Sequence, residues 1–182
     1  MKLHSSTHVV EKSGNFEENQ FSIEASAKAF MILSDGLYSN KILAVVRELS
    51  TNAYDSHVDA GVADRPFEVH LPTRLEPYFH VRDYGTSMTH DQCMTLYTTY
   101  FRSTRNDSND AVGCLGLGSK APFAYADSFT VEAFNDGEKR VYAAHRDSNG
   151  SPTFCLMDTV PTDEKNGIKV SLPVDKSDCD RF

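Results

Sequence analysis

The sequence has no apolar stretch long enough to cross a membrane. Its longest aliphatic run covers residues 42–46, whereas a spanning helix needs about 20 apolar residues. The N-terminal residues also lack the apolar core of a signal peptide. Cysteine is scarce, and its 4 residues include no Cys-x-x-Cys pair, which excludes a zinc site of recognisable spacing and argues against a disulfide framework. We therefore expect a cytoplasmic protein without a transmembrane segment.

Basic residues are also fewer than acidic ones. The 182 residues include 18 Lys and Arg against 26 Asp and Glu, which gives a net charge of −8 at pH 7. Because binding to a phosphate backbone calls for a basic face, we expect no direct nucleic-acid binding by this domain. A small anionic ligand remains compatible with this balance, since backbone amides can hold it. With 40% hydrophobic and 24% charged residues, the composition is that of one soluble globular domain that needs no metal or disulfide to fold.

Periodicity and turn residues predict the order of the elements. Residues 1–20 are polar and without a period, and we interpret them as an N-terminal arm before one domain at 21–182. Helices are expected, from apolar spacing and capping residues, at 25–33, 39–60, 91–97 and 119–125. The helix at 39–60 would be capped by Ser39 or Asn40 and stop at Gly61, and its apolar stripe would be Ile42, Val46, Leu49 and Ala53. Strands are expected, from alternation, at 67–71, 79–81, 128–134, 140–146, 153–158 and 168–172. Early helices, followed by strands joined at Asp-Gly and Asn-Gly turns, predict an α+β fold: a two-layer sandwich of helices on a mixed, mostly antiparallel sheet.

Three polar motifs are candidates for chemistry. In the long expected helix, Glu48, Asn52 and Asp55 stand at i, i+4 and i+7, and therefore share one face. A carboxylate and an amide oxygen in this arrangement can serve a magnesium ion and a water molecule that needs a base. Taken alone, the same spacing also fits a solvated polar face of a helix.

The other two motifs lie in loops. Asp83 follows an expected strand and precedes Gly85, so its carboxylate can accept a hydrogen bond from an amino group, although the pattern also fits a common Asx turn. Residues 113–120 place three glycines ahead of a helix N-terminus, with a serine and a lysine following, and backbone amides there can approach an anion. This spacing is neither that of a P-loop nor that of a Rossmann fingerprint, and a lone glycine-rich loop is a weak signal.

Together and in this order, the motifs resemble those of the GHKL ATPases, the Bergerat-fold group that includes Hsp90, MutL, type II topoisomerases and histidine kinases. The matching segments are, in chain order, Glu48-x-x-x-Asn52-Ala53-x-Asp55, Asp83-x-Gly85 with Met88-Thr89, Gly113-x-x-Gly116-x-Gly118, and Asn166-Gly167-Ile168-Lys169-Val170. The resemblance covers about residues 40–172. It implies an Hsp90-type ATP-binding fold, with ATP or ADP and Mg²⁺ as cofactors.

The resemblance also implies a role for each motif residue. Asn52 would ligate Mg²⁺, Glu48 would orient and deprotonate the attacking water, and Asp55 would support the same polar shelf. Asp83 would accept a hydrogen bond from the adenine amino group. The other nucleotide-binding residues would be Gly85 and Met88 around the base, and Gly113, Gly116, Gly118, Ser119 and Lys120 around the phosphates.

A polar loop at 98–112 would be the ATP lid, with Arg102 and Arg105 as candidate phosphate contacts. Two residues depart from the family pattern. Ser87 stands where the second motif usually has another glycine, so the turn beside the adenine is expected to differ. Ile168 stands where a threonine would normally help to hold the base, and it supplies no side-chain hydrogen bond.

A narrower resemblance concerns residues 20–60. The segments at 21–26, 30–34, 37–42 and 44–49 look like the N-terminus of the phage RIIA proteins, a family linked to lysis control and phage exclusion. Members of that family are much longer, so we expect the N-terminal part of a longer protein, in the cytoplasm of a bacterial host or peripheral to its membrane. The two resemblances imply slow ATP hydrolysis, a homodimer at full length and an unknown protein partner. The alternative is a nucleotide-sensing or protein-interaction module that kept the fold and lost turnover.

Overall fold

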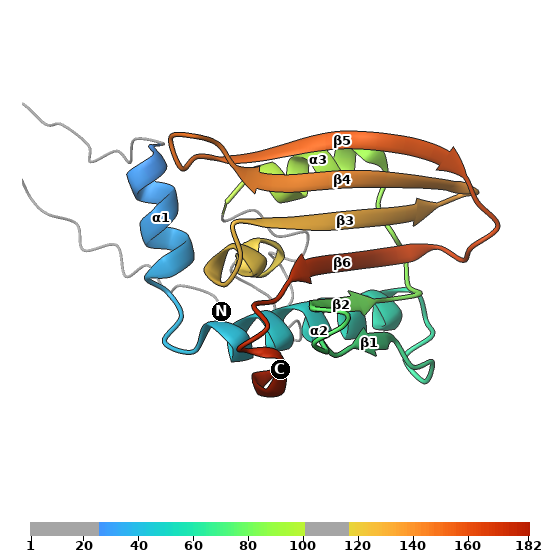
Figure 1. Cartoon of the computed structure of the whole chain (residues 1–182). Coiled ribbons are helices and arrows are strands. Elements are labelled where there is room, and N and C mark those ends of the chain that lie inside the picture. The colour runs from blue at the N-terminus through green and yellow to red at the C-terminus, as the bar shows by residue number, and fades with distance from the viewer. Residues whose placement is uncertain (1–25, 101–116) are drawn as a thin grey trace, which may run out of the picture.

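The computed structural model of the chain describes residues 26–100 and 117–182 (Figure 1). The elements are, in order, α1 (Ala27–Asp35), α2 (Lys41–Asp59), β1 (Glu68–His70), β2 (Tyr78–Arg82), α3 (His90–Thr98), η1 (Gly118–Ala124), β3 (Ser128–Asn135), β4 (Glu138–Arg146), β5 (Pro152–Pro161), β6 (Gly167–Pro173) and η2 (Cys179–Arg181). The predicted arm, Gly113, Gly116 and most of the predicted lid, with Arg102 and Arg105, lie outside the described residues.

The described strands form one sheet in the order β1-β2-β6-β3-β4-β5. Every pair of neighbouring strands is antiparallel, so the sheet, which was predicted to be mixed and mostly antiparallel, is antiparallel throughout. The connections within the β3–β5 meander are too short for the crossovers that parallel strands need. α2, α3 and η1 cover one face of the sheet, and no helix of the described chain covers the other (Figure 1). The α+β class and the two-layer arrangement are therefore confirmed.

Two turns set the register of the second half of the chain. Asp136 (φ 51°) and Gly137 (φ 83°) join β3 to β4, and both take the left-handed conformation that a two-residue type I′ hairpin needs. Gly150 (φ 83°) lies in the turn between β4 and β5. These are the hairpins that the Asp-Gly and Asn-Gly pairs predict.

α2 is the long helix predicted at 39–60, and its caps are at expected residues. The Asn40 side chain accepts a hydrogen bond from the Leu43 amide at 3.0 Å. The helix ends two residues before Gly61, whose φ of 70° continues no right-handed helix.

The buried side of α2 faces the sheet and contributes to the core. Its buried residues are Ile42, Ala44, Val45, Leu49, Ala53 and His57. The sequence predicted Val46 in this stripe, but Val45 is fully buried and Val46 is only half-buried. Val45 lies about 40° from Leu49 around the helix axis and Val46 about 60° on the other side, so Val45 points more directly at the sheet.

α3 begins at a capping box. The Thr89 hydroxyl accepts from the Gln92 amide, and the Gln92 side chain accepts from the Thr89 amide. On the side toward the sheet, Cys93 is buried and the Tyr97 ring stacks on Phe154 of β5, with 4.9 Å between centroids. These contacts hold α3 over β4 and β5, on the same face of the sheet as α2 but toward its other edge.

The helix predicted at 119–125 is the 3-10 helix η1, which begins at Gly118. Pro122 lies inside it, and proline lacks the main-chain donor that an α-helix would use. Residues 120–124 are buried where η1 packs against α1, α2 and β3. A short 3-10 segment offers an anion a weaker dipole than the α-helix that the sequence predicts.

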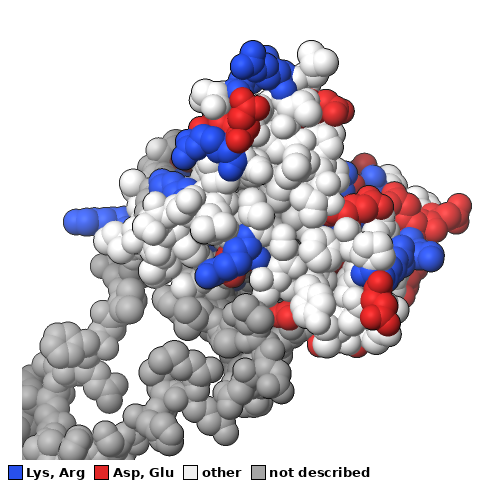
Figure 2. All heavy atoms as spheres, turned by 90° about the horizontal axis from the view of Figure 1, so that it is seen from below, with Lys and Arg blue, Asp and Glu red and all other residues white. Residues whose placement is uncertain are grey.

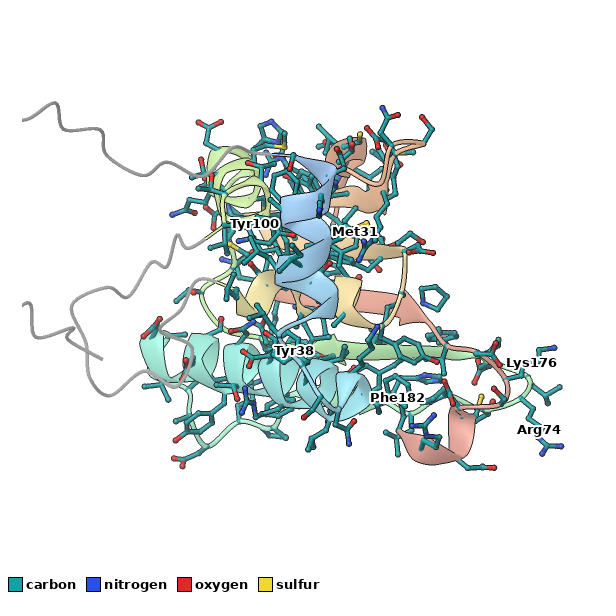
Figure 3. The ribbon with its side chains drawn as sticks, turned by 90° about the vertical axis from the view of Figure 1, so that its left-hand side faces the viewer. Met31, Tyr38, Arg74, Tyr100, Lys176 and Phe182 are labelled. Atoms are coloured by element: carbon teal, nitrogen blue, oxygen red, sulfur yellow. The ribbon has the colours of Figure 1, made fainter. Side chains whose placement is uncertain are left out.

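α1 stands beside the end of the sheet where β4 and β6 end, and it packs on η1 (Figure 1). Phe30 lies 5.2 Å from Tyr100 between ring centroids, and Figure 3 shows Tyr100 beside this helix. Arg146, at the end of β4, donates to the Ser34 hydroxyl and to the Phe123 carbonyl, both at 2.9 Å. One guanidinium thereby joins α1, η1 and the sheet.

The hydrophobic core lies between the sheet and the helices. Phe79 of β2, Val131 of β3 and Tyr142 of β4 have no exposed surface. Strand alternation aims Val81 and Val170 at the same side of the sheet. These two inward-facing residues form the edge of the core where the candidate site begins.

Candidate functional site

A cavity of about 870 Å³ opens between α2, α3, the start of η1 and the adjoining ends of β2 and β6. Residues of every predicted motif line it: Asn52, Asp55, Asp83, Ser87, Met88, Gly118, Ser119 and Ile168. Leu49, Ala53, Val81, Leu96 and Val170 contribute apolar surface. Segments that are far apart in the sequence therefore meet around one cavity of the size that small-molecule ligands occupy.

Glu48 lies beside this cavity rather than in its lining. Its Oε1 pairs with the exposed Arg47 guanidinium at 2.5 Å. Its Oε2 faces Gly118 so closely that a Cβ on that glycine would sit 2.7 Å from Oε2 and 3.7 Å from Asn52 Oδ1. The first and third motifs are thus in contact, and they can approach this closely because residue 118 has no side chain.

The Asp83 carboxylate is buried at the end of β2, with 5% of the residue exposed. Its Oδ1 accepts from the Ser56 hydroxyl at 3.1 Å and the Gly85 amide at 2.9 Å, and its Oδ2 accepts from the Ile168 amide at 3.1 Å. Burial raises the pKa of Asp83, while these donors and the nearby Arg82 charge lower it. Each carboxylate oxygen has two acceptor sites, so Oδ2 can still accept from a ligand amino group.

Gly85 lets the loop after β2 lie directly against α2. A Cβ at this position would overlap the main chain and the hydroxyl of Ser56. The Ser56 hydroxyl also accepts from the Thr86 amide at 3.1 Å, so it bridges the helix and the loop. The sequence motifs did not indicate Ser56, although its i+4 spacing from Asn52 places it on the same face of the helix.

Ser87 keeps a glycine-type backbone, with a φ of 60°. The left-handed conformation costs a residue with a side chain roughly 1–2 kcal/mol. The Ser87 hydroxyl donates to the Gly167 carbonyl at 3.0 Å, which ties this loop to the start of β6. The conformation that a glycine would favour is therefore present, together with a hydrogen bond that glycine could not make.

Ile168 contributes to the site through its main chain and its side chain. Its amide donates to the Asp83 carboxylate, and its carbonyl accepts from the Asp83 amide at 2.8 Å. Its side chain forms part of the cavity wall, with 8% of the residue exposed. An aliphatic side chain here offers a flat ring van der Waals contact without a hydrogen bond.

Lys120 is directed at α3 instead of the cavity, whose lining does not include it. Its ammonium donates to the carbonyls of Leu96 and Thr99 at 2.5 and 2.7 Å, at the C-terminal end of α3. Such carbonyls have no partner within the helix, and a cation there is favourable. Only 4% of Lys120 is exposed, and burial lowers its pKa to about 8.

The cavity is acidic. Asp55 and Asp59 of α2, Asp83, and Asp91 of α3 line it, whereas none of the described Lys and Arg residues does. These carboxylates would repel a bare polyphosphate, which would therefore need a cation to accompany it. Asn52 offers an amide oxygen in the same lining, which is a ligand type that Mg²⁺ accepts.

Other lining residues come from elements without a motif. Thr95 and Tyr97 reach the cavity from α3, and Asn135 reaches it from the end of β3. They meet the motif residues because the sheet order puts β3 beside β6 and because α3 lies across from α2. No signal in the sequence marks them, since their position depends on the tertiary arrangement.

His57 joins the end of α2 to the loop after β2. It is 1% exposed, its Nδ1 lies 2.9 Å from the Arg65 carbonyl, and its Nε2 accepts from the Tyr84 amide at 2.7 Å. The proton of the neutral ring is therefore on Nδ1. Within residues 26–100 and 117–182, no group of three or more His, Cys, Asp or Glu side chains could hold a metal ion.

No protein-family model matches the chain. The chain is similar to the chaperone protein HtpG of Rhodococcus jostii (strain RHA1), with 26% identity over 195 aligned positions, and to that of Mycolicibacterium vanbaalenii, with 24% over 188. The alignments cover 92% and 87% of this chain but 29% of each chaperone, so the chain spans less than a third of the length of these relatives. This weak, partial similarity to the Hsp90 family supports a GHKL-like relationship and no more.

None of the helices in the described part of the chain is both long and apolar enough to cross a membrane. On the face shown in Figure 2, the Lys and Arg side chains of the described residues are scattered among acidic ones and form no single basic patch. That face therefore offers a nucleic-acid backbone no continuous basic surface.

The conformation of Ser87 leads to a stability prediction. Ser87→Ala keeps the left-handed cost and loses the hydroxyl donor, so we expect a loss of about 0.5–1.5 kcal/mol in the free energy of unfolding. Ser87→Gly loses the same donor but removes the backbone cost, so it should be more stable than the alanine variant by about 1 kcal/mol. Urea denaturation of the three proteins measures both differences. Equal stability of the two variants would contradict this explanation.

Proposed function

We propose that this domain binds a magnesium–adenine nucleotide in the cavity and hydrolyses ATP slowly, in the manner of a GHKL ATPase. One observation carries the proposal: three motifs that are separate in the sequence meet around a single cavity. The weak similarity to HtpG, which extends over 92% and 87% of the chain, also supports the proposal.

The base would lie at the Asp83 end of the cavity. The Asp83 carboxylate would accept a hydrogen bond from the adenine amino group, using the acceptor site that its protein donors leave open. Met88, Val81 and Ile168 supply apolar surface for a flat ring. Gly85 would shape this end indirectly, because it allows the Asp83 loop to pack against α2.

The phosphates would lie near Gly118 and Ser119, beside Asn52. Asn52 would hold Mg²⁺ through its amide oxygen, and Asp55 would support the bound water from the same helix face. When bound, Mg²⁺ offsets the phosphate charge that this acidic cavity would otherwise repel. In this proposal, Lys120 holds the C-terminal end of α3 and does not bind the phosphates.

Glu48 is the proposed general base. Of its two carboxylate oxygens, Oε2 lies on the side of Gly118, where the phosphates would be, whereas Oε1 is paired with Arg47. We propose slow turnover because none of the described Lys and Arg residues lines the cavity, so no cationic side chain of these residues completes a γ-phosphate site. Catalysis of phosphoryl transfer depends on positioning, so an incomplete site leaves the water and the metal poorly aligned.

A nucleotide-sensing or protein-interaction module without turnover is the second candidate. The Arg47–Glu48 pair favours it, since it holds one oxygen of the proposed base away from the cavity. The aliphatic Ile168 in the wall favours it as well, because it removes one contact to the base. For the full-length protein, we propose a phage RIIA-like homodimer that acts with a protein partner in lysis control or phage exclusion, on the strength of the resemblance at 20–60.

The first prediction concerns the base. Asp83→Asn should weaken binding of Mg-ADP by about 1–3 kcal/mol, because a buried acceptor is replaced by a group that also donates. Isothermal titration calorimetry of the variant and the unmodified domain measures this difference. Asp163→Asn, an exposed change outside the cavity lining, is the matched control and should bind normally. Absence of binding to the unmodified domain would contradict the proposed function itself.

The second prediction concerns the metal. Asn52→Ala should abolish the magnesium dependence of ATP binding, since the ion loses its proposed protein ligand in an acidic cavity. The measurement is ATP affinity with Mg²⁺ and with a chelator. Thr51→Ala, one residue earlier on α2 and outside the lining, should respond to Mg²⁺ as the unmodified domain does. An unchanged magnesium response in the Asn52 variant would show that the metal role is assigned wrongly.

The third prediction concerns turnover. The chain should release phosphate from ATP at well below the ~1–100 s⁻¹ of protein kinases, and Glu48→Ala should remove that release while nucleotide binding persists. A coupled phosphate-release assay measures both rates. Release that does not depend on Glu48 would favour the sensing module. Fast release that depends on Glu48 would show that this chain already forms a complete site.

A further inference from the structure

A buried arginine lies behind the cavity, on the opposite face of the sheet. Arg82 is the last residue of β2, and 3% of it is exposed. Val81 before it lines the cavity, so strand alternation aims the Arg82 side chain away from the cavity. Among the described residues, no carboxylate lies within ion-pair distance of its guanidinium. A buried charge without such a partner needs other contacts to be tolerated.

Two main-chain carbonyls and two aromatic rings provide these contacts. The Arg82 guanidinium donates to the Asp83 carbonyl, and to the Lys165 carbonyl at 2.7 Å. It lies over the Phe134 ring at 3.9 Å and over the Tyr84 ring at 4.6 Å from the centroids. Both ring distances suit cation–π attraction, and the two ring contacts restrict the orientation of the guanidinium plane.

The two carbonyls belong to the segments that hold the Asp83 carboxylate. Lys165 precedes Gly167 and Ile168, and the Ile168 amide donates to Asp83 Oδ2 at 3.1 Å. Gly167 has a φ of 142°, and a Cβ there would collide with the Asp83 carbonyl and the Arg82 guanidinium. The chain therefore has a glycine where the guanidinium passes between the two segments.

We infer that Arg82 is a positioning residue for Asp83. From the far face of the sheet, its guanidinium fixes the Asp83 main chain against the segment 165–168, and so holds the Asp83 carboxylate in the orientation that accepts the adenine amino group. This inference rests on the proposed nucleotide site for its functional part. The contacts of the Arg82 guanidinium with the two carbonyls, which we call the clamp, are present in the protein without ligand.

The Arg82 charge has a second effect that distinguishes positioning from general stability. It lowers the pKa of Asp83, against the increase that burial causes. The titratable groups that line the cavity with Asp83 are Asp55 and Asp59 of α2 and Asp91 and Tyr97 of α3, and its chain neighbours are Arg82 and Tyr84. Because the Arg82 charge opposes the effect of burial, its loss should raise the pKa of Asp83 further.

Three variants separate the contributions of Arg82. Arg82→Met removes the charge and both hydrogen bonds and keeps much of the apolar bulk. Arg82→Lys keeps the charge but cannot reach two carbonyls with a planar fork. Arg65→Met is the matched control, because Arg65 lies over the same Tyr84 ring at 3.8 Å without a hydrogen bond to either carbonyl.

The measurements are the pKa of Asp83, from the side-chain carboxyl carbon shift in NMR, and the affinity for Mg-ADP by calorimetry. We expect Arg82→Met to raise the Asp83 pKa and to weaken binding about tenfold, which corresponds to about 1.4 kcal/mol. Arg82→Lys should keep the pKa near that of the unmodified domain but recover affinity only in part. Arg65→Met should change neither quantity.

Normal affinity and an unchanged Asp83 pKa in folded Arg82→Met would overturn the inference, even if thermal unfolding shows lower stability. If Arg82→Met does not fold, the lysine variant decides, because affinity equal to that of the unmodified domain would show that the fork is not needed. If the unmodified domain binds no adenine nucleotide, the proposed function fails. In that case the Asp83 titration in the ligand-free variants still tests the clamp, and equal pKa values in the Arg82→Met and Arg65→Met proteins would overturn it.

Discussion

Burial of the Asp83 carboxylate is the constraint on which the geometry of the site depends. A carboxylate removed from water is costly unless hydrogen-bond donors replace the solvent. Here the donors come from three places: Ser56 on α2, Gly85 in the following loop and Ile168 at the start of β6. These segments must therefore meet at one point. Gly85 allows these segments to come together, because a side chain at this position would overlap Ser56 of α2.

The same arrangement determines the charge of the cavity. α2 brings Asp55 and Asp59 to the wall and α3 brings Asp91, while the buried Lys120 ammonium is used at the end of α3. The described lining thus combines an amide oxygen and several carboxylates with no cationic side chain. Such a cavity discriminates against bare polyanions and suits an anion that arrives with a divalent cation. The proposed magnesium dependence follows from this balance.

Local signals predicted much of the fold. The apolar spacing and Asn40 cap predicted α2, and the Asp136-Gly137 pair predicted its hairpin, because these depend on neighbours in the sequence. Asn52 and Asp83, which line the cavity, were singled out for the same reason, as members of short motifs. The 3-10 form of η1 and the direction of Lys120 depend on burial against elements that are distant in the chain, which no local pattern encodes.

The central claim is that one cavity receives the base at Asp83 and the phosphates at Asn52 and Gly118. A crystal structure of the domain with Mg²⁺ and a non-hydrolysable ATP analogue tests it most directly. The account predicts the adenine amino group within hydrogen-bond distance of the Asp83 carboxylate, and Mg²⁺ between the phosphates and the Asn52 amide oxygen. Nucleotide bound elsewhere on the chain, or bound in this cavity with its base away from Asp83, would contradict the account.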